Sequence, residues 1–362
     1  MRIAVLGVGL IGGSVGLAAR KRLGAEVAGF DPDASTAEAA IDLGALDRAA
    51  DSAAAAVNGA DVVFCAAPVS ALPGLVRQAL DAADTDTVIT DVGSTKRQLL
   101  EDLPAAARER FIGGHPLAGA ETSGVENARA DLFEGARWYL TPTEHSTGLA
   151  YDRLQRTIAD LGARPQAIDP DSHDRLLATV SHLPHVIANV LVQEAASTLA
   201  EESERLPDVG PSFRDTTRVA GSNPAIWTDI YAANSDAVAE AIDAVAARLE
   251  DAAAMIRAGS TEVGDWHRAA GDDRRRLLEA EIEGGDLQEL RVAVENRPGT
   301  VAEIALALGR ERVNIEDMAL YPAADMRTGA ITLWVAGREE ADRAAEIVRG
   351  LGHGVSVLGD ED

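Results

Sequence analysis

The sequence predicts an α/β domain with a doubly wound parallel sheet, followed by an all-α domain and a small βαββαβ domain. Three observations lead to this prediction. Strand and helix signals alternate up to about residue 169, which is typical of a parallel sheet with helices on both faces. Strand signals then vanish, and they return only after Gly284 and Gly285. We therefore expect three domains, at residues 1–169, 170–285 and 286–362.

The first domain opens with the segment MRIAVLGVGLIGGSVGLAAR, in which an apolar strand, a glycine-rich loop and a helix follow one another. Gly7, Gly9 and Gly12 have the spacing GxGxxG: the first permits a tight turn, the second leaves room for a pyrophosphate, and the third lets helix and strand pack closely. A helix N-terminus also offers free N–H groups to phosphates. The segment predicts a Rossmann dinucleotide-binding domain, with a glycine-rich turn of another α/β fold as the alternative. The cofactor-binding residues would be Gly7, Gly9, Leu10, Ile11 and Gly12.

The second strand, in EVAGFD, ends at Asp31. A carboxylate about 20 residues past the glycines occupies the position that hydrogen-bonds a ribose 2′-hydroxyl. Asp31, with Asp33 nearby, would repel a 2′-phosphate. We therefore expect NAD rather than NADP as the cofactor.

The remaining elements follow from hydrophobic patterns and turn residues. In the first domain we expect strands at Arg2–Leu6, Glu26–Phe30, Asp61–Ala66, Thr87–Asp91, Phe111–Gly113, Trp138–Thr141 and Arg164–Ile168. In the last domain we expect strands at Glu289–Glu295, within VNIEDMAL, at Ala330–Val335 and at Val355–Leu358, with helices at Gly299–Leu308 and Glu339–Leu351.

Composition narrows the function classes. A net charge of −26 argues against nucleic-acid and anionic-membrane partners. We find no apolar stretch of 18 residues, and the N-terminus is a core strand rather than a signal peptide, so we expect a soluble, cytoplasmic protein. The single cysteine, Cys65, excludes a disulfide framework within the chain and is expected to be a small buried residue.

Two ends of predicted strands carry reactive side chains. Ser94 and Lys96 lie just past Asp91, and His115 lies two residues past Gly113. Ligands of open α/β sheets bind at such strand ends. A hydride transfer from an alcohol needs a base on the hydroxyl, and neutral imidazole accepts protons near pH 7. The alternatives are that Ser94 caps a helix and that His115 is a loop histidine with no task.

The helical domain supplies a second group of polar residues. Ser181 and His185 are four residues apart and share a helix face, which Pro184 should bend. His182 and His185 could also be read as metal ligands, but with no third ligand at a suitable spacing we predict no metal site. The apolar faces of this domain exceed what one small bundle could bury, which indicates a homodimer.

Arg214 and Arg218 are also four residues apart. Guanidinium groups bind carboxylates bidentately, so the pair predicts a clamp for an anionic substrate. The alternative is that both arginines pair with carboxylates of the protein, such as Asp215.

In combination, several motifs resemble the prephenate/arogenate dehydrogenase family of tyrosine biosynthesis over nearly the whole chain: GVGLIGGS, DVGSTK, GGHPLAGAE, HDRLLATVSHLPH and FRDTTRVAGSNPAIW. The resemblance implies NAD-dependent oxidative decarboxylation of prephenate to 4-hydroxyphenylpyruvate and CO2. Arogenate dehydrogenase, which forms tyrosine directly, is the alternative, because no residue reads the keto or amino group that distinguishes the substrates.

The same resemblance implies roles for individual residues. His115 would accept the hydrogen bond of the ring 4-hydroxyl, with Ser94 beside it, while Arg218 would hold a substrate carboxylate. Two positions depart from the family pattern, because Arg214 stands where a lysine is found and Ala120 where a threonine is common. The remaining expected substrate-site residues are Ser181 and His185 in the pocket, Glu121 as a gate, Arg214, and Trp227, which would reach toward the neighbouring subunit's site.

Residues 286–362 resemble an ACT domain, a regulatory module that binds small molecules. The resemblance implies an amino-acid ligand, with tyrosine as the end product, or a domain that only dimerises. The expected ligand residues are Asn296, Arg297, Pro298 and Gly299 in the loop before the first helix, with Asn314 on the paired subunit.

Two other classes share parts of this plan. β-Hydroxyacid dehydrogenases rely on a lysine in the helical domain, but Lys21 and Lys96 are the only lysines of this chain. An NAD-binding amino-acid sensor without catalysis would lack the proton acceptor or the carboxylate clamp, whereas both candidates are present. The dehydrogenase interpretation is therefore favoured.

Overall fold

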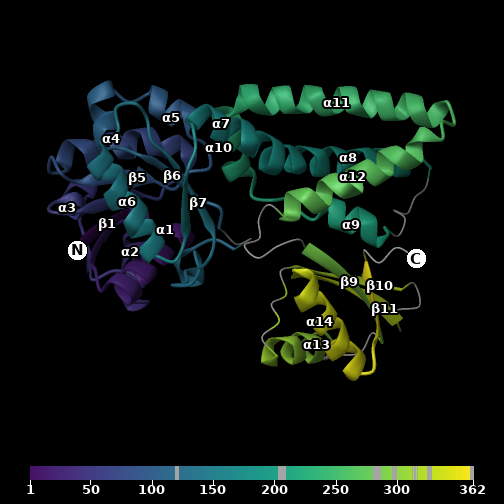
Figure 1. Cartoon of the computed structure of the whole chain (residues 1–362). Helices are drawn as coiled ribbons and strands as arrows, with labels where there is room; N and C mark the ends of the chain where they lie inside the picture. The colour runs from purple at the N-terminus through teal and green to yellow at the C-terminus, as the bar shows by residue number, and fades with distance from the viewer. Residues whose placement is uncertain are drawn as a thin grey trace. The chain divides into compact units, whose positions relative to one another are not determined.

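The computed structural model describes residues 1–118, 122–202, 209–279, 287–295, 300–311, 313, 315, 317–323 and 328–358. It divides into two compact units, Met1–Ala247 and Arg248–Asp362. Each unit has its own sheet and core (Figure 1).

A five-stranded parallel sheet forms the centre of the first unit, in the order β3-β2-β1-β4-β5. β1 (Arg2–Leu6) lies between β2 (Glu26–Phe30) and β4 (Val62–Cys65), and β5 (Val88–Asp91) follows β4. The strand order reverses at β1, so ligands are expected at the carboxyl ends of the strands there. The edge strand β3 (Arg48–Ala49) was not predicted, because two residues leave no readable pattern.

A second sheet continues from β5. It contains β6 (Gly113–Pro116), β7 (Arg137–Thr141) and β8 (Arg164–Ala167), and a single bridge between Ile89 and Phe111 joins it to β5. The expectation of one wholly parallel sheet is wrong here, because β6 and β7 run antiparallel. The first strand is also shifted, so that His115 lies inside β6 rather than after it.

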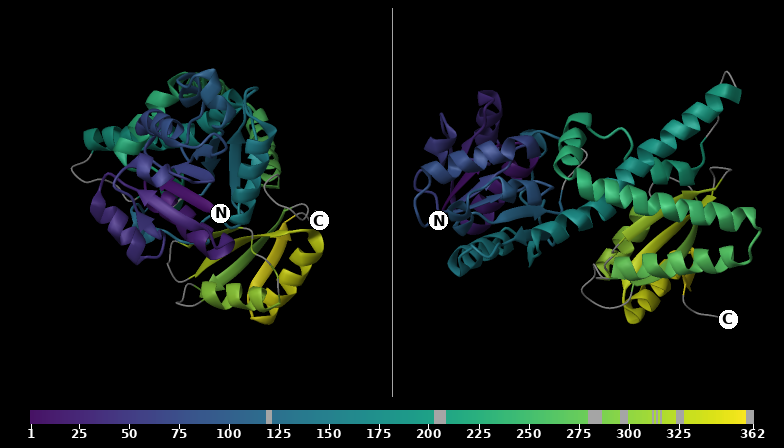
Figure 2. Two further views of the ribbon diagram at one scale, coloured as in Figure 1. Left: turned by 90° about the vertical axis from the view of Figure 1, so that its left-hand side faces the viewer. Right: turned by 90° about the horizontal axis from the view of Figure 1, so that it is seen from above.

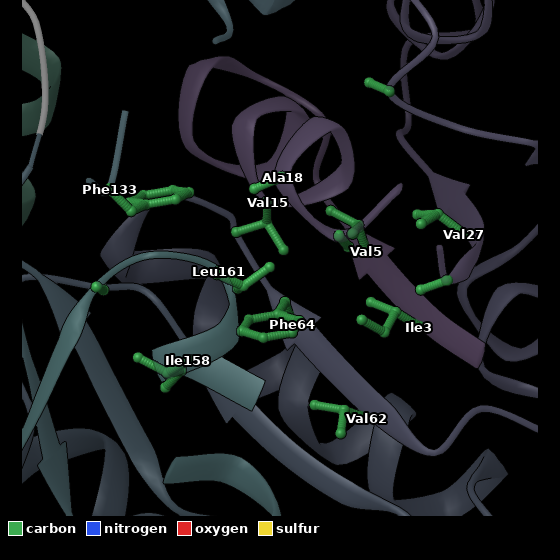
Figure 3. Close-up of a cluster of buried hydrophobic side chains, with 14 of the residues drawn as sticks. Ile3, Val5, Val15, Ala18, Val27, Val62, Phe64, Phe133, Ile158 and Leu161 are labelled. Carbon is green, nitrogen blue, oxygen red and sulfur yellow. The ribbon is translucent and has the colours of Figure 1, made fainter. Parts of the chain in front are cut away.

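Both faces of the five-stranded sheet are covered by helices. Alternate residues of each strand point to opposite faces, so Val5 packs into one core cluster and Leu6 into the other. Figure 3 shows the first cluster, in which Phe64 lies near Ile3 of β1 and Leu161. Its helices are α1 (Leu10–Ala18), α2 (Ala34–Asp42) and α6 (Gly148–Asp160), and those of the second cluster are α3 (Ala53–Val57), α4 (Leu72–Ala82) and α5 (Arg97–Glu101).

The described residues between 170 and 279 are helical with short connections, as expected. A π-helical turn, η5 (Ala178–His182), comes directly before Pro184, at the place where the sequence predicts an irregular helix. The helices are α7 (Pro170–Leu177), α8 (Leu183–Glu202), α9 (Pro211–Thr217), α10 (Pro224–Ala233), α11 (Ser235–Arg257) and α12 (Glu262–Glu279).

One described stretch contradicts the expectation that no segment is apolar enough to cross a membrane. Within the helical residues Pro170–Ser197, an 18-residue window has a mean hydropathy of 1.3, and 28% of that window is buried. The stretch is long and apolar enough to cross a membrane by length and composition alone. In the fold it also carries the buried polar side chains of His173, Asp174 and His182.

The second unit contains an antiparallel sheet in the order β10-β11-β9-β12. The described elements follow the expected βαββαβ order, and α13 and α14 lie against the sheet (Figures 1 and 2). Buried apolar side chains of both helices and of the strands form one core cluster. Residues 296–299 and Asn314, predicted to bind a ligand, lie outside the described residues. The elements are β9 (Leu287–Glu295), α13 (Thr300–Arg310), β10 (Asp317–Pro322), β11 (Thr328–Ala336), α14 (Arg338–Gly350) and β12 (Gly354–Leu358).

Candidate active site

The glycine loop between β1 and α1 has the geometry that the GxGxxG spacing predicts. Gly7 has a φ of +91°, and a Cβ there would lie 2.3 Å from the Ala66 carbonyl oxygen. A Cβ on Gly12 would lie 1.9 Å from the Gly7 oxygen, so only glycine lets the helix approach this closely. A Cβ on Gly9, in contrast, would meet nothing within 4 Å. The surface at Gly9 is therefore open to a ligand at the start of α1.

Hydrogen bonds to Asp31 connect this loop to the end of β2. Its Oδ2 accepts a hydrogen bond from the Val8 amide at 2.9 Å, and its Oδ1 accepts one from the Asp33 amide at 3.0 Å. Asp33 itself caps α2, and the hydroxyl and amide of Ser35 lower the pKa of its carboxyl by donating to it. Asp31 is therefore the carboxylate that is held at the loop.

A cavity of about 630 Å³ opens beside the loop. It is lined by Gly7, Gly9 and Asp31 and by apolar residues of the segment 66–75. Leu10 and Ile11 form the first turn of α1 and are partly buried. An apolar cavity with a glycine cradle and one carboxylate fits the adenosine half of a dinucleotide.

Three polar side chains form a chain of hydrogen bonds beside the two sheets. His115 Nδ1 in β6 lies 2.9 Å from His173 Nε2 in α7, and His173 Nδ1 lies 2.7 Å from Asp174 Oδ1. His173 and Asp174 are buried, whereas His115 is partly accessible to solvent. Tyr139, opposite His115 on β7, packs edge-on against the His173 ring at 5.7 Å. The hydrogen bonds thus run from the buried Asp174 through His173 to the partly accessible His115.

The acceptor role of Asp174 sets the tautomers of both imidazoles. Its carboxylate already accepts the backbone amides of Lys96 at 2.8 Å and Arg97 at 2.9 Å, so it also acts as the acceptor for His173 Nδ1–H. With its hydrogen on Nδ1, His173 presents Nε2 as an acceptor, and His115 donates to it from Nδ1. The Nε2 lone pair of His115 remains as the acceptor for an incoming hydroxyl.

Electrostatics favours the neutral form of His115. Burial, followed by His173, Lys96 and His182, holds the pKa of His115 well below its usual value of 6.5. Its imidazole is therefore unprotonated at neutral pH, which a general base requires.

Ser94 does not cap a helix. α5 begins at Arg97, with Lys96 at the cap position, so the alternative reading of Ser94 as a helix N-cap is wrong. The carboxylate of Asp174 takes that role, because it accepts the first amides of the helix. Ser94 is partly buried in the loop between β5 and α5.

Some of the expected residues of the helical region come together. The rings of His185 in α8 and Trp227 in α10 stack, with centroids 3.6 Å apart. Burial, and then the charge of Arg218, lowers the pKa of His185. Ser181 lies in the π-helical turn one turn before His185.

The structure brings the other expected residues into different surroundings. Arg214 is exposed on α9, and Glu121 lies outside the described residues. His182 Nδ1 lies 3.3 Å from Asn234 Nδ2. Burial lowers the pKa of His182 to about 4. Among the described residues, no group of three His, Cys, Asp or Glu side chains could hold a metal ion.

Sequence reasoning missed His173, Asp174 and Asn234, which donates to the Asp174 carbonyl at 2.8 Å. Part of the signal was in the sequence, because His173 and Asp174 are the first two residues of the motif HDRLLATVSHLPH. Cys65 is buried as expected, and burial together with Asp91 raises the pKa of its thiol.

Two family models match the chain. The model described as "Prephenate dehydrogenase, nucleotide-binding domain" matches residues 15–166, and "Prephenate dehydrogenase, dimerization domain" matches residues 169–269. The prephenate dehydrogenase of Bacillus subtilis (strain 168) is 31% identical over 354 residues, which are 96% of this chain and 95% of that protein.

Two solved structures are each similar to about three quarters of the chain. The prephenate dehydrogenase of A. aeolicus, in complex with hydroxyphenyl propionate and NAD+, has a TM-score of 0.70 and 30% identity, and the match covers 76% of this chain and 98% of that one. The arogenate dehydrogenase of Synechocystis has a TM-score of 0.68 and 28% identity, with coverages of 76% and 100%.

A dinucleotide cradle and a partly exposed imidazole whose tautomer is fixed define an oxidoreductase of the nicotinamide-dependent dehydrogenase class. Within that class, the chain belongs to the prephenate dehydrogenase family.

Proposed function

We propose that this protein is a prephenate dehydrogenase, which oxidatively decarboxylates prephenate to 4-hydroxyphenylpyruvate and CO2 with NAD as the oxidant. The observation that carries the proposal is the chain His115–His173–Asp174, which leaves one imidazole nitrogen of His115 as a proton acceptor. Membership of the family supplies the substrate class.

The residues perform the proton and carboxylate steps of this reaction. His115 Nε2 accepts the proton of the ring 4-hydroxyl, with Ser94 beside it, and the C4–H bond breaks as the ketone forms. The bond from C1 to its carboxylate then breaks, and CO2 leaves because the ring becomes aromatic. The phenolate oxygen takes back the proton that His115 holds, so no metal or separate acid is needed.

NAD, when bound, takes the hydride from C4. Gly7, Gly9 and Gly12, with Leu10 and Ile11, would hold its pyrophosphate, and Asp31 its ribose. On the substrate side, Arg218 would bind a carboxylate. The pocket would be lined by Ser181, His185, Arg214 and Trp227, with Glu121 as a gate.

These proposed sites assign a separate function to each of three domains. We infer a nucleotide-binding domain at residues 1–169, a helical substrate and dimerisation domain at 170–285, and an ACT regulatory domain at 286–362. A homodimer in the cytoplasm is the proposed assembly, and apolar residues such as Val190 and Val192, which are exposed on α8, support it. Sedimentation equilibrium distinguishes this dimer from a monomer.

Steady-state rates with prephenate and with arogenate, each with NAD and with NADP, test the proposal. We expect the highest kcat/KM with prephenate and NAD. The solved structure named an arogenate dehydrogenase favours arogenate as the second candidate. Activity with neither substrate would contradict the proposed function.

Removing the charge of Asp31 should narrow the preference for NAD. Asp31→Asn keeps an oxygen that can accept the Val8 amide but no longer repels a 2′-phosphate, so kcat/KM with NADP should rise relative to NAD. Asp31→Ala should also weaken the binding of NAD, because the glycine loop loses its hydrogen bond from the Val8 amide to Asp31. The ratio of the two kcat/KM values checks this, and a wild-type enzyme that prefers NADP would overturn the assignment.

We further propose that tyrosine binds the last domain and inhibits the enzyme. The loop before α13 would receive its carboxylate through Asn296, Arg297, Pro298 and Gly299, with Asn314 of a paired domain beside it. The βαββαβ order of the described elements supports this proposal.

Truncation near Gly284 should leave an active dimer that tyrosine no longer inhibits, because all proposed active-site residues lie before residue 230. Initial rates with and without tyrosine, for both forms, check this. A full-length enzyme that is indifferent to tyrosine would leave the domain structural or tuned to another ligand. A truncated enzyme that is still inhibited would show that tyrosine competes at the active site.

A further inference from the structure

A buried ion pair lies behind the proposed catalytic residues and has no part in the reaction as derived above. Lys96 Nζ contacts Asp91 Oδ2, and the side chains of both residues are 0% exposed. Buried ion pairs contribute little net stability, because the cost of removing both charges from water offsets their attraction. Stability alone therefore gives no reason for this pair.

The Asp91 carboxylate joins the loop that carries Ser94 to strand β6, which carries His115. Its Oδ2 accepts the amide of Gly93 at 2.8 Å, and its Oδ1 accepts the amide of Gly114 at 3.1 Å. Gly93 directly precedes Ser94, and Gly114 directly precedes His115. One carboxylate thus fixes the backbone in front of both residues.

The Lys96 side chain passes close to the strand that carries His115. A Cβ on Gly113 would lie 3.0 Å from Lys96 Cδ and 2.4 Å from Thr141 Oγ1, so the strand approaches the lysine closely only because residue 113 is glycine. The Lys96 side chain therefore lies against β6 at Gly113, two residues before His115.

We propose that the Asp91–Lys96 pair is a positioning unit for Ser94 and His115: the carboxylate sets the spacing between the Ser94 loop and strand β6, and the ammonium places a fixed positive charge near His115. This inference rests on the proposed function of His115 as the proton acceptor. The fixed charge opposes protonation of the imidazole, in line with the lowered pKa of His115, for which Lys96 is a cause after burial and His173.

Other titratable groups also face His115. His173 and Asp174 approach from α7, His182 from η5, Tyr139 from β7 and Asp91 from β5. The two carboxylates favour a protonated imidazole, whereas Lys96 opposes it. Removal of Lys96 alone would therefore leave Asp91 and Asp174 without the opposing charge.

The histidine ring signals of the full-length protein, followed by NMR as a function of pH, test this directly. The Asp91→Asn/Lys96→Met double variant removes both buried charges, keeps the volume, and leaves an oxygen that can accept the Gly114 amide. We expect Lys96→Met alone to raise the pKa of His115 by about one unit, because it removes only the opposing positive charge. The double variant should raise this pKa less, because it also removes the Asp91 carboxylate. His115→Asn assigns the signal, and Lys21→Met, which removes the exposed second lysine, is the matched control.

An unchanged pKa of His115 in the folded double variant would overturn the proposal, as would an equal shift in Lys21→Met. If Lys96→Met does not fold, the double variant alone decides the result. The acid limb of kcat/KM should move by the same amount as the NMR value. A pKa that moves in the NMR titration while the acid limb stays in place would confirm the positioning unit and contradict the proposed role of His115.

Discussion

Replacement of His115 with asparagine is expected to lower kcat by roughly 10²–10⁴ with little change in KM. Asparagine can still donate a hydrogen bond toward His173, so the ground-state packing changes little. It cannot take a proton from the substrate hydroxyl, and this interaction is made only as the C4–H bond breaks. Steady-state kinetics with saturating NAD separates the two parameters.

His145→Asn is the matched control, because His145 lies in the turn between β7 and α6 and pairs with Glu144. It should leave both parameters unchanged. A His115→Asn variant with normal kcat and a raised KM would make His115 a binding residue rather than the base.

The same assignment fixes the direction of the pH dependence. The neutral form of His115 is the active one, and its pKa lies well below 6.5. The acid limb of kcat/KM should therefore fall well below pH 6.5, and the rate should stay level as the pH rises through 6.5 to neutrality.

The part of the site that sequence predicts best is local in the chain. Gly7, Gly9 and Gly12 lie within six residues. Glycine itself indicates a left-handed or crowded backbone, because other residues rarely fit there. Asp31 was also predicted, because the ribose-binding carboxylate of this motif stands at the end of the second strand, about 20 residues past the glycines. Short-range geometry determines both features.

The support behind His115 could not be predicted, because it depends on distant contacts. His173 is 58 residues further along the chain, and the amides that Asp174 accepts are 78 and 77 residues before it. No spacing in one sequence shows which acidic residue will cap α5. The sequence therefore offered Ser94 as the alternative capping residue, whereas the Asp174 carboxylate accepts the first amides of the helix.

The direction of β7 is a second example. Strand signals carry no direction, and the alternation with helices suggested a parallel crossover. Among the described residues between β6 and β7 the only helical element is the short 3-10 turn Val125–Asn127, whereas parallel strands are usually joined by an α-helix. The antiparallel pairing places Tyr139 opposite His115, which the parallel arrangement did not predict.

Removal of the Arg218 guanidinium is expected to raise KM for the substrate by roughly 10–100-fold while kcat changes much less, because a hydrogen-bonded carboxylate partner contributes in the ground state and the transition state alike. The structure favours Arg218 over Arg214 for this role. Both arginines are exposed, but the charge of Arg218 acts on His185, whose ring stacks on Trp227. Arg214 lies one helical turn earlier, on α9.

Arg214→Ala is thus the matched comparison, on the same helix face and with the same loss of charge, and its effect on KM should be smaller. Arg218→Lys keeps the charge but loses the planar fork, so it should recover only part of the affinity. Initial rates over a range of substrate concentrations at saturating NAD measure all three variants. Equal effects of the two alanine variants would indicate a general electrostatic attraction rather than a clamp. A fall in kcat at unchanged KM for Arg218→Ala would place this residue in the chemical step.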